Sequence, residues 1–386
     1  MNPQLTITDT TNQLMAAKRA SRKLAKSKRE DRDQALELIS KQLLESKDSI
    51  IAANKKDIEE GTQHGLADAL IDRLVLNEQR LTGMTGSIQN IVSQKDPIGR
   101  VLASWKLRNG MAIEQVTVPF GVICVIYEAR PNVTTDAVSL AIKSGNAIIL
   151  RGSHHAINSN EAIVNVIREA LSKSKLDPDI VQFISKKERE ESVRILQATE
   201  YVDLVIPRGG NELKKLVEQN SKIPVIGAGG GTCHLFVDDG ADEKMALDIA
   251  VNAKTQRPGV CNAIETILVH KNIASGIMPK LEQALGEKGV KIHGCDRTRK
   301  LMKTATPVPQ DDWSKEYLAL EVAVKIVDSL EEAVNHINQY GTKHSEAIVT
   351  KSTENAKQFQ EDVDAACVYV NASTRFTDGE EWGLGS

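Results

Sequence analysis

Cys261 is the residue of this chain whose setting best suits a nucleophile. It lies in the stretch TQRPGVCNA, where a Pro-Gly turn precedes it and an apolar run, Ile264 to Val269, is predicted to form a strand directly after it. A thiol fixed by a tight turn at the start of a buried strand is held still and partly exposed, and its thiolate form is the reactive one. A lone cysteine is more often a small buried hydrophobe, so this interpretation depends on the rest of the chain.

The other cysteines indicate neither a metal site nor a disulfide framework. The total of five is odd, no CxxC motif occurs, and His293 and Cys295 have no second ligand pair nearby. We therefore expect no bound metal. We also expect four cysteines to be dispensable for the chemistry: Cys124, Cys233, Cys295 and Cys367.

The glycine-rich segment GAGGG at 227–231 could cradle a phosphate with its backbone N–H groups. It fits equally well a turn in which only small residues are tolerated. The sequence contains neither a GxGxxG fingerprint at a strand-helix junction nor a Walker A motif.

Composition excludes several classes of protein. The 386 residues suggest more than one domain, and 41% hydrophobic with 26% charged residues is typical of a globular protein. A net charge of −3 and an aromatic content of 3% argue against nucleic-acid binding. No apolar run approaches the roughly 20 residues of a membrane span, and the polar N-terminus lacks a signal peptide, so we expect a cytoplasmic protein without a membrane partner.

Periodicity predicts the elements that must position Cys261. Residues 12–96 have apolar side chains at helical spacing, and Asn109-Gly110 predicts a β-hairpin over 102–118. From Gly121, apolar strands alternate with helices, which is typical of a parallel sheet covered on both faces. The predicted strands of this part are GVICVIYEA, NAIILRG, IVQFI, VDLVI and IPVIG.

A second α/β region is predicted to run from Ile264 to about Asn371, after a helix over 242–253. It contains the predicted strands AIETILVH, EVAVKIV and CVYVNAS and a helix over 330–340. The fold class is therefore α/β, with two strand-helix regions in succession.

Four stretches carry a family resemblance: VPFGVICVIYEARPNVTTDAVSLAIKSGNAIILRGS at 118–153, the cysteine stretch, VDSLEEAVNHINQYGTKHSEAI at 327–348 and NASTRFTDG at 371–379. They make the chain similar to the aldehyde dehydrogenase superfamily, and within it to the γ-glutamyl phosphate reductase family. The resemblance implies an aldehyde-dehydrogenase-like fold, with a Rossmann-like cofactor domain, an α/β catalytic domain and a small oligomerisation hairpin.

The implied domains have definite bounds. We expect an NADP(H)-binding domain at 1–101 and 118–253, the hairpin at 102–117 and the catalytic domain at 254–371. Residues 372–386 are expected to return to the cofactor and oligomerisation region, and the family's final segment is expected to be missing after Ser386.

The resemblance also implies a reaction, the NADPH-dependent reduction of L-glutamyl 5-phosphate to L-glutamate 5-semialdehyde in proline biosynthesis. Cys261 would attack the acyl phosphate and form a thioester, which hydride then reduces. The oxyanion that develops needs hydrogen-bond donors. Candidates are the backbone N–H of Cys261 and one of two side chains after the strand GVICVIYEA, Asn132 or Arg130.

A missing carboxylate favours reduction over oxidation. Ordinary aldehyde dehydrogenases carry a glutamate that activates water, whereas the matching segment here, PVIGAGGGT at 224–232, contains none. An enzyme whose thioester must be reduced should not activate water beside it. The alternatives are an ordinary aldehyde dehydrogenase and a catalytically inactive scaffold subunit.

Cofactor contacts follow from the resemblance and lie after predicted strands. Arg151 and Ser153 could bind the 2′-phosphate of NADPH, and no acidic residue occurs between Ala147 and Asn160 to oppose it. Glu316 is expected to hold the nicotinamide ribose. The full set of expected cofactor contacts is Arg151, Gly152, Ser153, Pro207, Arg208, Gly209, Gly210 and Glu316.

The substrate is anionic, so cations should line its site. Arg257, His344 and Arg375 are the candidates, because each lies in one of the family-like stretches. The expected partners are L-glutamyl 5-phosphate, further copies of the chain in a homo-oligomer and, functionally, glutamate 5-kinase.

Overall fold

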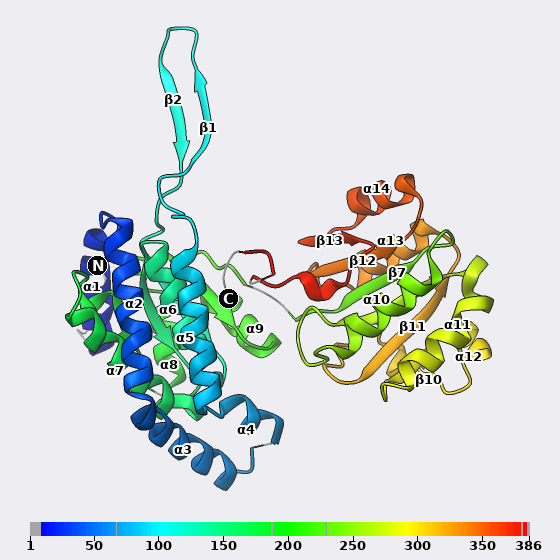
Figure 1. Cartoon of the computed structure of the whole chain (residues 1–386), viewed down its shortest axis with the longest axis horizontal. Coiled ribbons are helices and arrows are strands. Elements are labelled where there is room, and N and C mark those ends of the chain that lie inside the picture. The colour runs from blue at the N-terminus through cyan, green and yellow to red at the C-terminus, as the bar shows by residue number, and fades with distance from the viewer. Residues whose placement is uncertain (1–8, 67, 187, 228–229, 380, 384–386) are drawn as a thin grey trace. The chain divides into compact units, whose positions relative to one another are not determined.

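The computed structural model describes residues 9–66, 68–186, 188–227, 230–379 and 381–383. They form two compact units that divide between residues 227 and 228 (Figure 1). The expected boundary was residue 253. It lies earlier because the strand Cys233–Val237 pairs in parallel with Ile264–His270 and so belongs to the second unit.

A parallel four-stranded sheet, in the order β5-β4-β3-β6, forms the centre of the first unit. Its strands are β3 (Val122–Tyr127), β4 (Ala147–Arg151), β5 (Val181–Phe183) and β6 (Leu204–Arg208). Every residue of β3 is buried, which explains its uninterrupted apolar sequence. The strand expected at IPVIG is reduced to a single bridge between Val205 and Val225.

Helices cover this sheet in more than one layer. Helix α2 packs against α5 and α7, and α7 in turn contacts β5, so the N-terminal helices extend the core outward from the sheet (Figure 1). The helices are α1 (Asp9–Leu24), α2 (Arg29–Glu45), α3 (Lys47–Gln63), α4 (Asp68–Leu74), α5 (Glu78–Ser93), α6 (Asn132–Lys143), α7 (Ile157–Ser172), α8 (Arg189–Leu196) and α9 (Asn211–Asn220).

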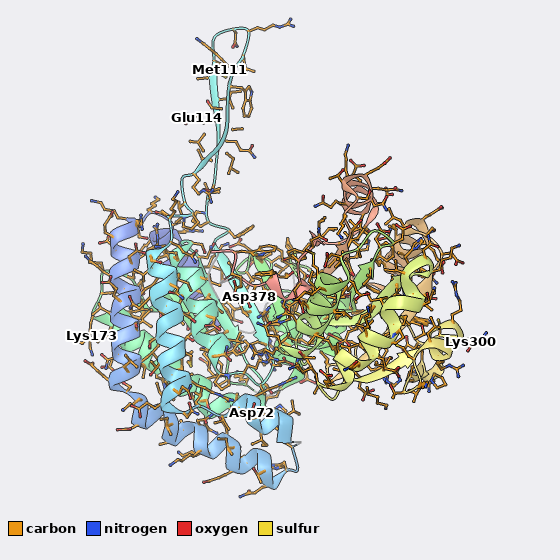
Figure 2. The ribbon with its side chains drawn as sticks, turned by 45° about the vertical axis from the view of Figure 1, so that its right-hand side comes forward. Asp72, Met111, Glu114, Lys173, Lys300 and Asp378 are labelled. Atoms are coloured by element: carbon orange, nitrogen blue, oxygen red, sulfur yellow. The ribbon has the colours of Figure 1, made fainter. Side chains whose placement is uncertain are left out.

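The predicted β-hairpin is present and projects from the first unit. Strands β1 (Val101–Lys106) and β2 (Ala112–Val116) pair antiparallel, and Gly110 adopts a φ of 89° in the turn between them. Figure 2 shows the side chains of this hairpin, including Met111 and Glu114, away from the rest of the first unit. Several of the apolar ones are exposed: Val101, Leu102, Trp105, Leu107, Met111 and Val116.

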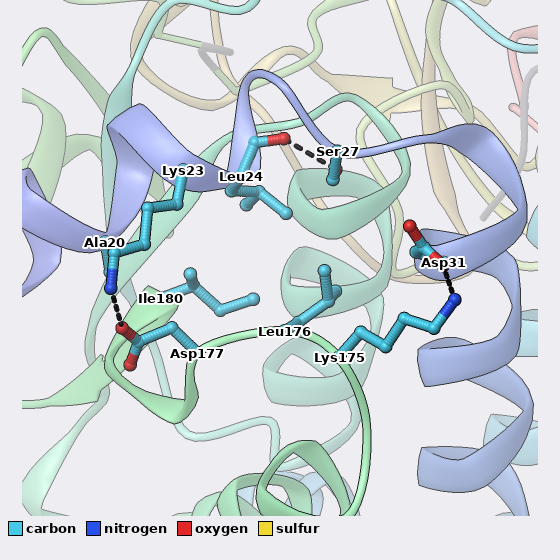
Figure 3. Close-up of a pocket in the computed structure, with 9 residues that line it drawn as sticks. All are labelled: Ala20, Lys23, Leu24, Ser27, Asp31, Lys175, Leu176, Asp177 and Ile180. Atoms are coloured by element: carbon cyan, nitrogen blue, oxygen red, sulfur yellow. Dashed lines mark hydrogen bonds and ion pairs between the residues drawn. The ribbon is translucent and has the colours of Figure 1, made fainter.

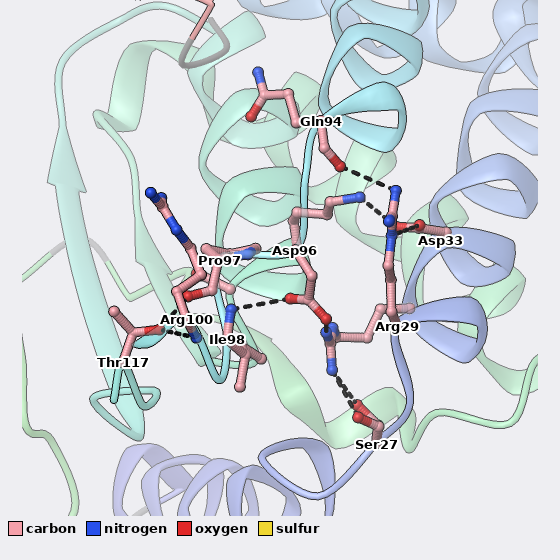
Figure 4. A network of polar contacts seen from close by, with 12 residues as sticks. Ser27, Arg29, Asp33, Gln94, Asp96, Pro97, Ile98, Arg100 and Thr117 are labelled. Carbon is pink, nitrogen blue, oxygen red and sulfur yellow. Dashed lines mark hydrogen bonds and ion pairs between the residues drawn. The ribbon is translucent and has the colours of Figure 1, made fainter. Parts of the chain in front are cut away.

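A polar network holds the base of the hairpin to the helices (Figure 4). The guanidinium of Arg32, only 2% exposed, donates to the Asp96 carboxylate at 2.6 Å and to the Ser27 carbonyl at 2.7 Å. The same carboxylate accepts the N–H of Ile98, and Thr117 Oγ1 accepts the N–H of Arg100. The chain therefore leaves and re-enters the unit at fixed points.

The second unit contains a parallel seven-stranded sheet in the order β10-β9-β11-β8-β7-β12-β13. Side chains alternate along its strands, so Leu235 and Val237 enter one apolar core and Phe236 enters the core on the opposite face. The strands are β7 (Cys233–Val237), β8 (Ile264–His270), β9 (Lys291–Gly294), β10 (Thr306–Pro307), β11 (Glu321–Val327), β12 (Ser345–Val349) and β13 (Cys367–Val370).

Helices α10 (Glu243–Thr255) and α11 (Lys271–Gly286) cover one face of this sheet, and α13 (Leu330–Tyr340) and α14 (Thr353–Asp362) cover the other (Figure 1). The short helix α12 (Asp296–Leu301) contacts α11 and β11. In the part of the chain that the structure describes, no helix is long and apolar enough to span a membrane.

The segment after residue 371 differs from expectation. Residues up to Trp382 belong to the second unit rather than to the cofactor domain. Hydrogen bonds hold them there, because Thr374 Oγ1 donates to the Asn262 carbonyl at 2.6 Å and Thr377 Oγ1 contacts Ser345 Oγ at 2.7 Å.

Candidate active site

Cys261 lies in a turn between α10 and β8 and is partly exposed. The next residue anchors this turn: Asn262 is buried, and its amide donates to the Thr377 carbonyl at 2.9 Å while its own carbonyl accepts Thr374 Oγ1. None of the five cysteines, all of which the structure describes, forms a disulfide. The thiol is thus held at a fixed, accessible position.

Arg375 braces the same turn from the C-terminal segment. Its Nε donates to Gln256 Oε1 at 2.9 Å, and its Nη1 contacts Asn262 Oδ1 closely. Burial lowers the pKa of Arg375, whereas the charges of Asp378 and Cys261 raise it and that of Arg257 lowers it. The structure therefore places Arg375 within electrostatic reach of both Cys261 and Arg257.

The glycines of the GAGGG segment are required by close packing. A β-carbon on Gly231 would overlap the carbonyl group of Cys261 and lie 2.8 Å from its Cα. A β-carbon on Gly230 would lie 3.1 Å from the carboxyl carbon of Glu316. Residues 228 and 229 of the segment lie outside the described residues. Of the two interpretations of this segment, a turn that tolerates only small residues fits Gly230 and Gly231.

Glu316 is half-buried beside the turn that carries Cys261, the candidate nucleophile. Its Oε1 accepts the backbone N–H of Gly231 at 2.8 Å, and Gly231 touches the backbone of Cys261. The structure thus brings together two predicted site residues that are well separated in the sequence.

His344 joins this group through Cys233. The Nδ1 of His344 lies 4.0 Å from Cys233 Sγ, which donates to the Cys261 carbonyl at 3.1 Å. Burial lowers the pKa of His344, and the nearby Glu316 carboxylate raises it. Cys233, which is expected to be dispensable for the chemistry, thus contacts the backbone of Cys261, and its dispensability stays a prediction.

These residues share one edge of the second sheet. Cys233 begins β7, Cys261 precedes β8, Glu316 precedes β11 and His344 precedes β12. The strands are parallel, so their amino ends meet at the same edge. Among the described residues, no group of three or more His, Cys, Asp or Glu side chains could hold a metal ion.

In the first unit, the expected cofactor contacts lie at the carboxyl ends of the strands. Arg151 of β4 and Pro207 of β6 both pair with Ile126 of β3, which lies between these two strands. Just beyond β3, the Glu128 N–H donates to the Arg208 carbonyl at 3.0 Å. Ligands of open parallel sheets bind at this edge. The turn that follows β6 packs closely, because a β-carbon on Gly209 would lie 2.9 Å from Leu213. Gly210 precedes α9 as its N-cap residue.

Arg151, Gly152 and Ser153 line one small cavity of about 80 Å³. Gly152 lies so close to its neighbours that a β-carbon would be 3.1 Å from the Tyr127 ring. The cationic side chain of Lys186 and the imidazole of His154 also line the cavity. Sequence analysis missed Lys186, because only the pairing of β5 with β4 brings the segment after β5 beside Arg151. The residue types fit a phosphate-bearing group of a nucleotide.

Arg151 also has a structural role. Its Nη2 donates to the carbonyls of Glu188 at 2.9 Å and Lys186 at 3.4 Å, and burial lowers its pKa. Ser153 Oγ accepts the His155 N–H at 3.3 Å. The guanidinium therefore ties the segment after β5 to the end of β4.

The two candidate oxyanion donors follow β3. Asn132 is exposed at the start of α6, and its amide donates one hydrogen bond to Asp136 at 3.1 Å. The amide has two N–H groups, so the other can serve a ligand. Arg130 is half-buried and pairs with Glu128 at 3.4 Å. Burial raises the pKa of Asp136 to about 6, whereas Asn132 and the Arg208 charge lower it.

A larger pocket of about 410 Å³ lies elsewhere in the first unit, between α1, the start of α2 and the segment 175–180 (Figure 3). Its four charged side chains pair with one another, Lys23 with Asp177 at 3.5 Å and Lys175 with Asp31 at 2.7 Å. The two positive and two negative charges balance, so this pocket has no excess of positive charge to bind an anionic substrate.

Comparison with known proteins identifies the family of the chain. A profile of the aldehyde dehydrogenase family matches residues 2–298. A γ-glutamyl phosphate reductase of Dictyoglomus thermophilum is 49% identical over 356 residues, which cover 92% of this chain and 86% of that protein. One of Caldicellulosiruptor bescii is 48% identical and covers 96% of this chain and 89% of that protein.

Solved structures agree. The crystal structure of γ-glutamyl phosphate reductase from Thermotoga maritima is 42% identical, has a TM-score of 0.94 and covers 97% of this chain and 91% of that chain. An engineered glycolyl-CoA reductase with bound NADP+ is 15% identical with a TM-score of 0.66, over 95% of this chain and 88% of that chain, and shares the fold.

The close approach of Gly231 to Cys261 yields a test. Gly231→Ala should lower the free energy of unfolding by about 1–3 kcal/mol, because backbone atoms must shift to admit the methyl group. Gly240→Ala, where no atom lies within 4 Å, should change it by less than about 1 kcal/mol. Urea denaturation of both variants measures the difference, and equal effects would contradict the packing argument.

Proposed function

Because the chain belongs to the aldehyde dehydrogenase family, and within it to the γ-glutamyl phosphate reductases, we propose that it reduces L-glutamyl 5-phosphate to L-glutamate 5-semialdehyde with release of phosphate. This is the second step of proline biosynthesis from glutamate. The observation that carries the proposal is the half-buried Cys261, braced by Asn262 and Arg375 in a chain 49% identical to such a reductase.

In the first step, Cys261 thiolate attacks the acyl carbonyl carbon. The carbon–sulfur bond forms, the bond from that carbon to the phosphate oxygen breaks, and phosphate leaves with the electron pair. The product is a thioester on Cys261. The backbone N–H of Cys261 is one proposed donor to the oxyanion, and Asn132 and Arg130 are the side-chain candidates that the family resemblance implies.

In the second step the thioester is reduced. NADPH, when bound, supplies the hydride. The chain's residues stabilise the oxyanion again, and the hemithioacetal then collapses, so that the carbon–sulfur bond breaks, the aldehyde leaves and Cys261 returns as thiolate. The segment 224–232 contains no carboxylate to activate water, which supports reduction of the thioester over its hydrolysis.

Cations are proposed to bind the anionic substrate. Arg257 is exposed in the turn of Cys261, and His344, whose pKa is lowered by burial, is proposed as a neutral hydrogen-bonding group near Glu316. Arg375 already donates to Gln256 and Asn262, so its contribution combines positioning of the turn with positive charge.

The family uses a nicotinamide cofactor, and we propose NADPH in particular. Arg151 and Lys186 line a cavity into which Ser153 and His154 also face, and such a set suits the 2′-phosphate. Pro207, Arg208, Gly209 and Gly210 are proposed for the pyrophosphate, and Glu316 for the nicotinamide ribose.

The assembly and its supply of substrate follow from the same proposal. An isolated two-stranded hairpin is marginally stable in water, and this one exposes Trp105, Leu107 and Val116. We propose that further copies of this chain cover it in a homo-oligomer.

Because the substrate is an acyl phosphate, the reaction follows that of glutamate 5-kinase, and we place it in the cytoplasm.

The proposed reaction can be assayed in reverse. The protein should reduce NADP+ with glutamate 5-semialdehyde only when phosphate is present, because phosphate must release the acyl group from Cys261. Cys261→Ala should lower kcat by more than about 1,000-fold, whereas Cys367→Ala should stay within twofold of the wild type as the control. Oxidation without phosphate would indicate an ordinary aldehyde dehydrogenase, and no turnover in any arm a scaffold.

The choice of cofactor is tested by two dissociation constants. Arg151→Glu and Lys186→Met should each raise the Kd for NADPH, because a charge-assisted contact to phosphate is lost. For Arg151→Glu we expect an increase of about 10- to 100-fold, which corresponds to about 1.5–3 kcal/mol of binding free energy. The Kd for NADH should change far less. If both cofactors weaken equally, these side chains serve the fold or the pyrophosphate instead.

The hairpin proposal is tested by sedimentation velocity. Trp105→Ser with Val116→Ser should convert the oligomer to smaller species, because both side chains are exposed and apolar. Glu114→Ser, on the same hairpin, should leave the sedimentation coefficient unchanged. A wild type that sediments as a monomer would refute the proposal.

A further inference from the structure

A fully buried ion pair lies directly behind the nucleophile turn. Lys254, near the end of α10, donates to Glu265 Oε2 at 2.7 Å, and both side chains are 0% exposed. Glu265 is the second residue of β8, so the pair links the helix before Cys261 to the strand after it. Burial lowers the pKa of Lys254 and raises that of Glu265 to about 7, while each charge favours the charged form of the other.

Each partner makes a further contact with the backbone. Lys254 Nζ donates to the Ile264 carbonyl at 2.9 Å, which fixes the start of β8. The second carboxylate oxygen of Glu265 accepts the N–H of Leu318 at 3.2 Å. The pair therefore reaches from the nucleophile turn to the loop at 314–320.

That loop carries Glu316 and needs an anchor. Leu318 has a φ of 53°, in the left-handed region that a leucine rarely occupies, and such a conformation persists only when its surroundings impose it. A β-carbon on Gly259 would lie 3.6 Å from the Leu318 carbonyl oxygen, so the loop touches the Pro-Gly turn itself. Thr232 Oγ1 holds the other side of the loop through the Ser314 carbonyl at 3.0 Å.

We propose that Lys254 and Glu265 are positioning residues that fix the Glu316 loop against the nucleophile turn, so that Glu316 and Cys261 keep one mutual geometry. Glu265 acts through the N–H of Leu318, and Lys254 holds the carboxylate in place for that bond. The proposal rests on the proposed function for its catalytic consequence, and on the contacts within this unit for its structural part.

A purely stabilising role is separable from positioning. Replacing both members of a buried ion pair by apolar residues is often neutral or stabilising, because two desolvation costs disappear together, whereas removing one member leaves a buried charge. Double variants therefore test the contact to Leu318 without an uncompensated charge.

Two matched double variants isolate that contact. Lys254→Met with Glu265→Leu removes the pair and the acceptor for Leu318, whereas Lys254→Met with Glu265→Gln removes the pair but keeps an amide oxygen at the same length. Lys254→Met with Glu265→Met replaces the leucine variant if that one does not fold. Hydrogen exchange of the peptide 314–320, followed by mass spectrometry, and kcat in the phosphate-dependent assay are measured for each.

In the leucine variant, exchange of 314–320 should be at least tenfold faster and kcat at least tenfold lower, with the KM for the semialdehyde within twofold. The glutamine variant should stay within threefold of the wild type in both exchange and kcat. Equal exchange in the two variants would overturn the proposal, as would faster exchange with unchanged kcat. If the wild type itself shows no phosphate-dependent turnover, the proposed function fails. The hydrogen-exchange rates of 314–320 in the two double variants then decide alone whether Glu265 positions this loop.

Discussion

The second unit depends on one backbone contact, between Gly231 and Cys261. The two residues come from segments that are separate in the sequence, and they approach so closely that any side chain at 231 would overlap the Cys261 carbonyl group. Cys233, two residues further on, donates its thiol to the same carbonyl at 3.1 Å. The backbone of Cys261 is therefore held on one side by the strand β7 and the turn before it. Because β7 pairs with β8, the sheet itself sets the position of the thiol.

Polar contacts complete the support of this turn from other directions. Asn262 binds the segment 374–377, and the buried pair of Lys254 and Glu265 binds the loop that carries Glu316. Burying such groups is costly unless they are paired and hydrogen-bonded, and here Asn262, Lys254 and Glu265 each hydrogen-bond a backbone group of a neighbouring segment. The result is a candidate nucleophile, Cys261, whose turn is held both by strand ends and by hydrogen-bonded segments that lie outside the strands. That arrangement suits covalent catalysis, where the reacting atoms must be aligned before the step begins.

The two sheets place their functional residues at opposite kinds of edge. In the first unit the proposed cofactor contacts follow the carboxyl ends of β4 and β6, as in other open parallel sheets. In the second unit the proposed chemistry lies at the amino ends of β7, β8, β11 and β12. Glycines serve both edges for the same reason: Gly152 and Gly231 each allow an approach that a β-carbon would prevent.

The sequence by itself determined the α/β class and the hairpin at Asn109-Gly110 and singled out Cys261 as the candidate nucleophile, because periodicity, turn chemistry and a thiol after a Pro-Gly turn are local signals. It also yielded Arg151, Glu316 and His344 as candidates through family-like stretches. Only the tertiary structure decided which strands share a sheet, and so moved the boundary between the units from residue 253 to 227. It alone revealed Lys186, Cys233 and the Lys254–Glu265 pair. Their roles arise from strand pairing and burial, which join residues that no local pattern connects.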